Sequence, residues 1–312
     1  MHSLTIGNRT LAWGERTYVM GILNLTPDSF SGDGLIPSPP VPPPLGEGGE
    51  VRTAAPLPLG EGGGLRAARR FLAAGVDILD VGGESTRPGS QPVEAEEELR
   101  RVIPTIQAIA AEFPDALISI DTYKAVVAEA ALQAGAQIVN DVWGLRADAE
   151  LAGVAARHQA VVVLMHNRSK PANVEVRQRL GKAYAGAEYL DLLGEVKLEL
   201  LESVAIVRSA GIPDERILLD PGIGFGKAVG QNLELIDHLG EIRALGFPVL
   251  LGPSRKSFIG YTLNLPPDQR LEGTAAAVAI GIARGADIVR VHDVETMVRV
   301  ARMSDAIVRR KG

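Results

Sequence analysis

Eight short apolar runs alternate with segments of helical periodicity along the chain of 312 residues. The runs are rich in Val, Ile and Leu and show no polar face, which is typical of strands buried on both sides of a parallel sheet. They are Tyr18 to Leu23, Ile78 to Val81, Leu117 to Ile120, Gln137 to Val139, Val161 to Met165, Ile217 to Leu219, Val249 to Leu251 and Ile288 to Val291. Strict alternation predicts a parallel sheet closed into an α/β barrel, the (β/α)8 or TIM barrel, and an open doubly wound sheet is the alternative.

The segments between these runs predict helices. They are Arg66 to Ala74, Val93 to Glu112, Tyr123 to Gln133, Asp148 to His158, Glu188 to Ser209, Gln231 to Leu245, Gly273 to Arg284 and Val294 to Val308. Before the first core strand, Ser3 to Trp13 has Gly7 and Asn8 at its middle, which indicates a short hairpin. We therefore expect residues 1–312 to form one barrel domain.

One segment differs in composition from the rest of the chain. Residues 35–64 are crowded with Pro and Gly and repeat the block PLGEGG at Pro44 and Pro58. Such a segment has too little apolar surface to offset its ordering entropy, so it predicts a flexible, disordered insertion after the first core strand. A docking segment for a partner is the functional alternative.

Composition excludes several classes of site. The formal net charge of -6 argues against a nucleic-acid surface as the main function. The absence of cysteine excludes disulfides, thiolate metal sites and cysteine nucleophiles. The first twenty residues lack a signal-peptide pattern, and no apolar run reaches the roughly 20 residues that span a bilayer. These features predict a soluble cytoplasmic protein with no membrane partner.

Polar side chains follow every predicted strand. They are Asn24; Glu84, Ser85, Thr86 and Arg87; Asp121; Asn140 and Asp141; His166; Asp220; Ser254, Arg255, Lys256 and Ser257; and Arg290, His292 and Asp293. Taken singly, each has an ordinary structural explanation, such as a helix cap at Asp121 or a turn at Asp220. In a barrel, however, the loops after the strands meet at one rim, so together these residues predict a shared site.

The residues of this rim divide into two chemical kinds. Arg87, Lys256, Arg290 and His292 are cationic groups suited to an anion such as phosphate. The acceptors Asp121, Asn140 and Asp220 suit a flat heterocycle that presents N–H donors. A ligand with a donor-rich ring at one end and phosphates at the other fits both kinds.

Metal and nucleotide signatures are weak. The histidines are too few and too scattered for a zinc cluster. Asn24 alone holds Mg²⁺ only if phosphate oxygens and waters complete the octahedron. The glycine run from Gly222 to Lys227 matches neither nucleotide-binding fingerprint. The loop that begins at Asn24 is therefore read either as a binding loop or as ordinary turn chemistry.

In these motifs the chain resembles the dihydropteroate synthase family, the barrel enzymes of the folate pathway. The motifs that carry the resemblance are Asn24-Leu-Thr-Pro-Asp-Ser-Phe-Ser31, Asp80-Val-Gly-Gly-Glu-Ser-Thr-Arg-Pro-Gly-Ser90, Ser119-Ile-Asp-Thr122, Asn140-Asp141, Asp220-Pro-Gly-Ile-Gly-Phe-Gly-Lys227, Ser254-Arg-Lys-Ser257 and Arg290-Val-His292. They span nearly the whole chain outside the insertion and occur in the family's order. The first two motifs are highly specific.

The resemblance implies a transferase that condenses 6-hydroxymethyl-7,8-dihydropterin diphosphate with 4-aminobenzoate to give 7,8-dihydropteroate and diphosphate. It also implies roles for individual residues. The pterin would be held by Asp121, Asn140, Met165, Asp220, Phe225 and Lys256, of which Asp121, Asp220 and Lys256 are the catalytic candidates. The diphosphate would face Asn24, Thr86, Arg87, Arg290 and His292, with Asn24 as a ligand of the Mg²⁺ cofactor. The aminobenzoate pocket would include Phe30, Pro88 and Ser257.

The resemblance further implies a homodimer, the assembly that is usual in this family. The insertion after Gly34 departs from the family and falls in a loop expected to close over the site.

Two functional alternatives remain at this stage. One is a pterin-binding methyltransferase that uses methyltetrahydrofolate, although the cations Arg87, Arg290 and His292 would then lack a diphosphate. The other is a catalytically silent paralogue that only binds pterin, although Asn24 and Lys256 are intact.

Overall fold

Eight parallel strands form the centre of the protein in the computed structural model, which describes residues 3–26, 63–86, 90–170, 174–177 and 179–310. Their order is β10-β7-β6-β5-β4-β3-β12-β11. The strands are β3 (Tyr18–Asn24), β4 (Ile78–Gly82), β5 (Leu117–Asp121), β6 (Ile138–Asp141), β7 (Val161–Met165), β10 (Ile217–Asp220), β11 (Leu250–Leu251) and β12 (Ile288–Val291). A parallel bridge between Leu219 and Val249 joins the two end strands, so the sheet closes and the predicted (β/α)8 barrel is confirmed.

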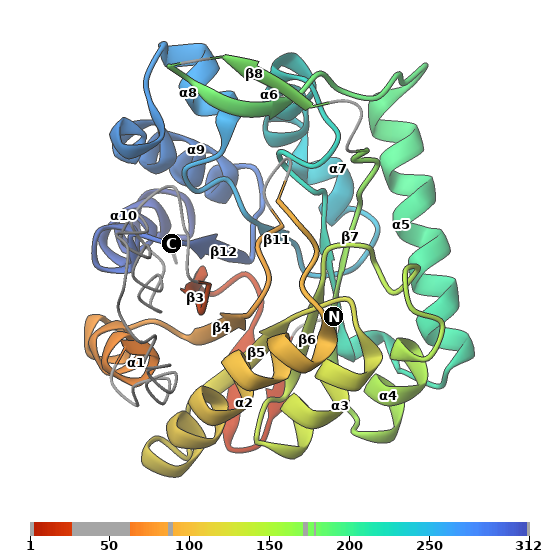
Figure 1. The fold of residues 1–312 in the computed structure, drawn as a ribbon. Coiled ribbons are helices and arrows are strands. Elements are labelled where there is room, and N and C mark those ends of the chain that lie inside the picture. The colour runs from red at the N-terminus through yellow and green to blue at the C-terminus, as the bar shows by residue number, and fades with distance from the viewer. Residues whose placement is uncertain (1–2, 27–62, 87–89, 171–173, 178, 311–312) are drawn as a thin grey trace, which may run out of the picture.

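Helices surround the strands, as Figure 1 shows. They are α1 (Gly63–Ala74), α2 (Ala95–Glu112), α3 (Ala125–Gln133), α4 (Leu151–Arg157), α5 (Leu192–Ser209), α6 (Val229–Asp237), α7 (Leu239–Arg243), α8 (Ser257–Leu263), α9 (Leu271–Ala283) and α10 (Val294–Val308). The single helix expected over Gln231 to Leu245 was wrong, because α6 ends at Asp237 and α7 starts at Leu239. His238 lies between them with φ -102° and ψ 23°, outside helical geometry.

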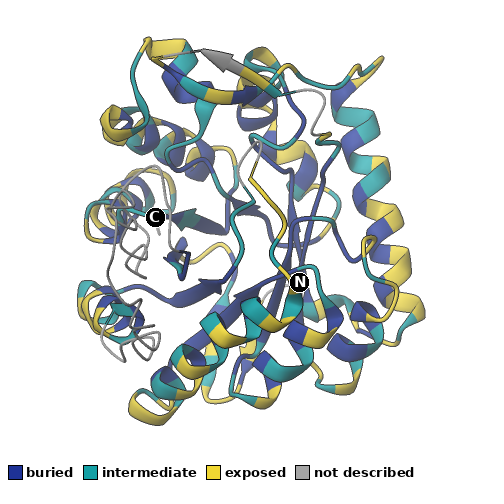
Figure 2. Ribbon diagram, in the orientation of Figure 1, coloured by how far each residue is buried: buried dark blue, intermediate teal, exposed yellow. Residues whose placement is uncertain are grey.

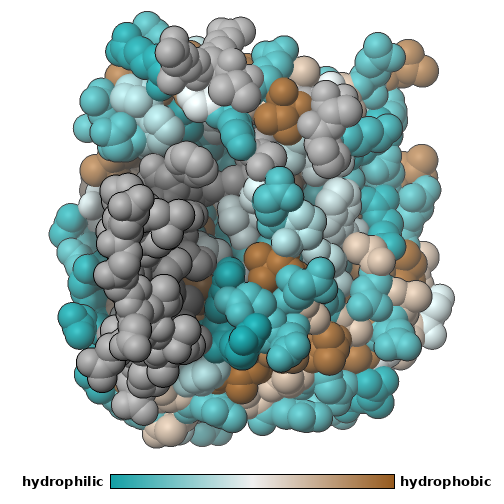
Figure 3. Space-filling model, in the orientation of Figure 1, coloured by the Kyte–Doolittle hydropathy of each residue, from teal (hydrophilic) through white to brown (hydrophobic). Residues whose placement is uncertain are grey.

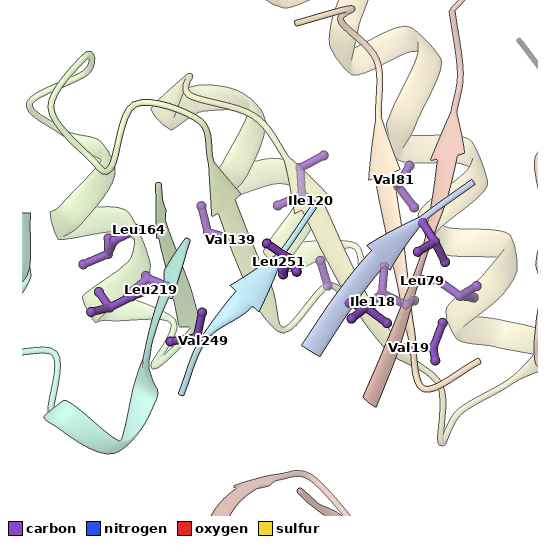
Figure 4. Close-up of a cluster of buried hydrophobic side chains, with 14 of the residues drawn as sticks. Val19, Leu79, Val81, Ile118, Ile120, Val139, Leu164, Leu219, Val249 and Leu251 are labelled. Carbon is purple, nitrogen blue, oxygen red and sulfur yellow. The ribbon is translucent and has the colours of Figure 1, made fainter. Parts of the chain in front are cut away.

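The barrel strands bury both of their faces in separate hydrophobic clusters. Outward-facing residues such as Val19, Leu79, Ile118 and Val139 belong to the larger cluster that packs against the helices (Figure 4). Inward-facing residues at adjacent positions of the barrel strands belong to a second cluster inside the barrel, namely Tyr18, Met20, Ile78, Leu117, Ile138, Val161, Val163, Leu218, Leu250 and Ile288. Because strand side chains alternate with a period of two, both faces of each short apolar run are buried.

The N-terminal hairpin closes the lower end of this interior. Strands β1 (Ser3–Ile6) and β2 (Arg9–Ala12) pair antiparallel, which confirms the hairpin predicted from Gly7 and Asn8. Leu4, Ile6 and Leu11 join the inner cluster. Trp13 lies edge-on to Tyr18, with ring centroids 5.6 Å apart. Apolar side chains therefore close the barrel interior at the amino ends of the strands, and polar groups lie at the carboxyl ends.

Two elements were not predicted. Strands β8 (Val174–Arg177) and β9 (Gly181–Tyr184) form a second antiparallel hairpin between β7 and α5. Helix α8 starts at Ser257, directly after a polar motif that was interpreted only as part of the site. The two elements meet, because the Tyr261 hydroxyl of α8 donates to Gly181 O of β9 at 3.2 Å. Arg270, directly before α9, also donates to Leu180 O in the turn of the hairpin at 2.7 Å.

The outer surface is mixed in polarity. In Figure 2 the barrel strands are mostly buried, and exposed residues lie on the outer faces of the helices and in loops. On the face drawn in Figure 3, hydrophobic residues form separate patches among hydrophilic ones. No helix in the described ranges is long and apolar enough to cross a membrane. The insertion predicted over residues 35–64 lies outside the described residues except for Gly63 and Gly64, which open α1.

Candidate functional site

The upper part of the barrel interior is polar, directly above the inner apolar cluster. Four strands carry a polar residue two positions beyond an apolar residue of that cluster. These pairs are Ile78 and Asp80, Ile138 and Asn140, Leu218 and Asp220, and Ile288 and Arg290. The period of two places each of these polar residues on the same inner face as the apolar residue below it. Asp121 has the same relation to Ser119 and Leu117 on β5. The strands thus deliver a set of charged and amide groups to one mouth.

Arg290 joins two carboxylates at this mouth. Its Nε donates to Asp80 Oδ2 at 2.6 Å, and its terminal nitrogen donates to Asp121 Oδ2 at 2.5 Å. Asp80 Oδ2 also accepts from Asn140 Nδ2 at 3.2 Å. Asp80 was missing from the sequence-based candidates, because it lies inside an apolar run that was read as a plain buried strand. The charge of Asp80 within the apolar run could have identified it, because a buried Asp requires hydrogen-bonding or charged partners.

The electrostatics of this cluster are those of a desolvated ion-pair network. Burial raises the pKa of Asp121 to about 7, and Asp80 adds to the rise although Arg290 opposes it. Burial acts to lower the pKa of Arg290, but Asp80 and Asp121 outweigh it and raise that pKa. Within the described part of the chain, Asp80 Oδ1 and Asp121 Oδ1 are buried without a hydrogen-bond partner. Both oxygens have unused acceptor capacity, and the one on Asp121, which is 8% exposed against 0% for Asp80, is the candidate to accept from an N–H donor of a ligand.

Asp220 and Lys256 form the other side of the mouth. Asp220 Oδ1 accepts from Gly222 N at 2.7 Å, and burial raises the pKa of the carboxyl. Lys256 Nζ donates to Ile223 O at 2.7 Å and lies 3.8 Å from the centroid of the Phe225 ring. This side thus offers a carboxylate, an ammonium group and an aromatic face together.

Gly252 connects the two sides. A Cβ at this position would lie 3.9 Å from Arg290 Cβ and 4.0 Å from Asp220 Oδ2. Asp220 and Arg290 are therefore close neighbours across a glycine, and Arg290 is in turn bound to Asp121. Asp121, Asp220 and Arg290 therefore lie close together at the carboxyl ends of their strands.

Other candidate residues lie around the same mouth or outside the described residues. His292 Nδ1 is 3.1 Å from Ser254 Oγ, and Met165 ends β7 with 4% exposure. Asn24, Thr86 and Ser257 are half-buried, with Asn24 at the end of β3 and Ser257 at the start of α8. Phe30, Arg87 and Pro88 lie outside the described residues. The roles of all these residues remain predictions.

Several residues near the strand ends make structural contacts and are not part of the polar set at the mouth of the barrel. Asp141 accepts from the backbone N–H groups of Trp143 and Leu145 and so shapes the turn after β6. Arg255 is bound to Asp293 through two hydrogen bonds of 2.9 and 2.6 Å. His166 follows the outward-facing Leu164 and contacts Lys227 behind the site. Chain position alone could not separate these residues from the inner set.

The donor set limits what metal this mouth could hold. The described residues include no group of three or more His, Asp or Glu side chains arranged to hold a metal ion. Asn24 offers a hard amide oxygen, and such an oxygen suits Mg²⁺ when substrate phosphates and waters supply the remaining ligands. The residues therefore fit a magnesium ion that arrives with a phosphorylated substrate.

Comparisons with known proteins show which family this chain is similar to. A family model described as "Pterin binding enzyme" matches residues 62–292. A dihydropteroate synthase of Clostridium beijerinckii is 46% identical over 308 residues, which cover 98% of this chain and 100% of the relative. A crystal structure of a dihydropteroate synthase from Clostridium difficile in the presence of pteroic acid superposes with a TM-score of 0.77 at 44% identity, covering 96% of this chain and 99% of that one. A dihydropteroate synthase of Xanthomonas albilineans with 4-aminobenzoic acid gives a TM-score of 0.80 at 36% identity and covers 98% of both chains.

Proposed function

This chain belongs to the dihydropteroate synthase family of pterin-binding enzymes, and we propose that it condenses 6-hydroxymethyl-7,8-dihydropterin diphosphate with 4-aminobenzoate. The products are 7,8-dihydropteroate and diphosphate, which places the reaction in folate synthesis. The observation that best supports this function is the buried set of acceptors around Arg290 at the mouth of the barrel. Such a set matches a heterocycle that carries several N–H donors.

The pterin ring is bound by the acceptors of the inner face. We assign Asp220, Asn140 and Asp121 to its N–H donors, with Met165 and Phe225 packing on the ring. Lys256 lies over Phe225 and near enough to Asp220 to influence its pKa, so it completes the pocket as a donor. Buried, pre-positioned groups of this kind reward a correctly placed ring, because their desolvation cost is already part of the folded protein.

The diphosphate leaves from the opposite end of the substrate. We assign His292, Thr86 and Arg87 to its oxygens together with Arg290, which in the protein without substrate is occupied by Asp80 and Asp121. Mg²⁺, held at Asn24, would supply charge neutralisation to the departing diphosphate. Arg290 can serve both ends, since its pairing with Asp121 also sets the charge beside the ring.

The bond changes are simple. The methylene C–O bond breaks, diphosphate departs with the electron pair, and the aryl amine of 4-aminobenzoate forms the new C–N bond and loses a proton. Asp121 and Asp220 offset the positive charge that develops on the pterin as the C–O bond breaks. Phe30, Pro88 and Ser257 are assigned to the aminobenzoate pocket. We propose that bond breaking runs ahead of amine attack, which predicts a large secondary isotope effect at the methylene; a value near unity would contradict it.

The activity is tested by incubating the protein with 6-hydroxymethyl-7,8-dihydropterin diphosphate, 4-aminobenzoate and Mg²⁺ and detecting dihydropteroate by mass. We expect product that depends on both substrates. A parallel reaction with methyltetrahydrofolate and a corrinoid acceptor should give no methyl transfer. Absence of dihydropteroate, or efficient methyl transfer, would reject the proposed function.

Assembly and location are further parts of this proposal. We propose that the protein is a homodimer that acts in the cytoplasm. Ile280 of α9 and Met303 and Ile307 of α10 are exposed apolar side chains that a partner could cover. Analytical ultracentrifugation tests the homodimer, and a monomer at micromolar concentration would contradict it. Cell fractionation tests the location.

A further inference from the structure

Lys227 is a buried lysine that the proposed chemistry does not use. It is 2% exposed, and its ammonium is enclosed by the loop that follows β10. Nζ donates to Gly222 O at 3.0 Å and to Phe225 O at 3.1 Å, and it lies 2.9 Å from His166 Nδ1. A buried ammonium with three acceptors around it is fully satisfied, so the loop is wrapped around its own lysine.

His166 fixes the pattern of donors in this cluster. Burial lowers its pKa to about 2, so the imidazole is neutral and Nδ1 can accept from the ammonium. His166 Nε2 lies 3.2 Å from Glu199 Oε2, although the two atoms are not aligned as a hydrogen bond. Arg168 is bound to the same Glu199 through its Nε at 2.7 Å. The cluster therefore ties the loop to α5.

The glycines of this loop are required by close backbone approach. Gly222 has φ +72°, and a Cβ there would lie 1.8 Å from His166 O. Gly226 has φ +63°, and a Cβ there would lie 2.5 Å from the carbonyl carbon of Arg168. Both positions press the loop against the segment that follows β7. Only glycine combines a positive φ with so little space, so the loop has one shape.

The same loop forms one wall of the proposed pterin pocket. Its Ile223 O accepts from Lys256 Nζ, its Phe225 ring lies beneath that ammonium, and its Gly222 N donates to Asp220. Gly224 has φ +82°, and a Cβ there would lie 2.6 Å from Lys256 Cδ. The atoms that place Lys256 and Asp220 therefore belong to the loop that encloses the Lys227 ammonium.

We propose that Lys227 is a positioning residue for the pterin pocket: its ammonium holds residues 221–226 in the shape that sets Asp220, Phe225 and Lys256 against the ring. This inference rests on the proposed function. It assigns to Lys227 no contact with substrate and no proton transfer. Loss of the ammonium leaves Phe225 O and His166 Nδ1 without their donor and leaves Gly222 O with only the Phe225 amide, and the loop relaxes to satisfy them.

The direct test is the variant Lys227→Met, which keeps the length of the side chain and removes its charge. Calorimetric titration with 6-hydroxymethyl-7,8-dihydropterin diphosphate, without 4-aminobenzoate, should show a Kd increased by about tenfold or more. The KM for 4-aminobenzoate should stay within about twofold, because its proposed pocket does not include this loop. Lys197→Met is the matched control, since Lys197 pairs with Glu241 on the surface, and it should leave both values unchanged.

Hydrogen exchange provides a readout of the loop itself. In Lys227→Met, exchange of the Phe225 amide, which donates to Gly222 O, should accelerate, whereas the β7 amides of Val161–Met165 should not change. If Lys227→Met does not fold, Lys227→Gln retains two donors and should show the same changes to a smaller extent. Unchanged pterin affinity in a folded variant would overturn the inference alone. Absence of pterin binding by the wild-type protein would overturn the proposed function as well.

The pH dependence gives an independent check. Burial lowers the pKa of Lys227 to about 7, so the ammonium loses its proton as the pH rises through neutrality. The advantage of wild type over Lys227→Met in pterin affinity should therefore shrink between about pH 6 and pH 8.5. Asp220, Lys256, Glu199, Arg168 and His166 face Lys227 and are present in both proteins, so their own titration largely cancels in the ratio. A ratio that is constant or grows with pH would contradict the role of the charge.

Discussion

The lower and upper halves of the barrel interior stand on the same strands but bury different chemistry. The lower half contains Ile78, Ile138 and Leu218, each at most 1% exposed. One step higher on the same strands are Asp80, Asn140 and Asp220, which are also buried. The lower layer gains free energy from burial, at about 25 cal/mol per Å² of apolar surface. The upper layer loses part of that gain to desolvated charge.

This difference teaches where the protein gives up stability for function. In the upper half, Asp80 Oδ1 and Asp121 Oδ1 are buried without partners in the described part of the chain. Such oxygens destabilise the unliganded protein, and a ligand that donates to Asp121 recovers part of the cost. The apolar lower half holds the strands in register while the upper half remains poised for binding. Changes in the two halves should therefore have opposite signatures.

The largest expected effect comes from the upper half. Asp220→Asn replaces a carboxylate acceptor by an amide of the same size, so kcat/KM for the pterin substrate should fall by about 1,000-fold, or roughly 4 kcal/mol. The free energy of unfolding should be unchanged or slightly higher, because one buried charge is removed. Steady-state kinetics and urea unfolding measure the two. The control is Asp237→Asn, a surface partner of Arg284. Near wild-type kinetics for Asp220→Asn would break the comparison.

The lower half should respond in the opposite way. Ile138 is fully buried in the inner cluster, so Ile138→Ala should reduce the free energy of unfolding by about 3 kcal/mol. The folded fraction should keep a kcat/KM within about threefold of wild type, because no atom of Ile138 reaches the mouth. The exposed Val126→Ala is the control. A large kinetic loss with little loss of stability would show that the two layers are not separate.

The pH dependence of the free energy of unfolding should show that the buried carboxyl group of Asp121 destabilises the upper half when it is charged. Burial raises the pKa of Asp121 to about 7, so this carboxyl supports the fold when protonated and loses that support as the pH rises towards neutrality. The attraction of Arg290 is already part of this raised pKa, and each pKa unit corresponds to about 1.4 kcal/mol. Relative to wild type, Asp121→Asn should thus gain stability between pH 4 and pH 8 without ligand, because asparagine carries no charge that must be desolvated. Urea unfolding at several pH values measures this gain. A gain of the opposite sign would contradict the assignment.

The smallest effect is expected at Asp80, which we place behind the ligand contacts. Asp80→Asn keeps the shape but removes the charge that orients Arg290, and it weakens the acceptor for Asn140. We expect kcat/KM to fall by about tenfold, roughly 1.4 kcal/mol. Asp115→Asn, in the loop before β5, is the control. A loss as large as that of Asp220→Asn would move Asp80 into direct contact with substrate.

The sequence predicted the barrel because its strands are short, apolar and β-branched, whereas the sidedness of individual residues required the structure. His166 directly follows β7 and Asn140 lies one residue before the end of β6, but His166 has the outward parity of Leu164, and Asn140 has the inward parity of Ile138. That parity depends on where each strand starts, and chain position gives it only within a residue or two. Asp80 was hidden for a related reason, because a single charge in an apolar run reads as a strand.

Local signals explain the remaining differences. The pattern over Gln231 to Leu245 is continuously amphipathic, and the break at His238 has no proline to announce it. The β8 and β9 hairpin is short and partly exposed, so its alternation is faint, and contacts with α8 help to hold it. In each case tertiary contacts decide what local propensity leaves open.

The central claim is that the upper inner face of the barrel binds the pterin, and a crystal structure of this protein with dihydropteroate tests it most directly. The account predicts ring nitrogens within about 3.2 Å of the carboxylates of Asp121 and Asp220, with Lys256 beside the ring. Clear density for the pterin at any other place, with this mouth filled only by water, would contradict it.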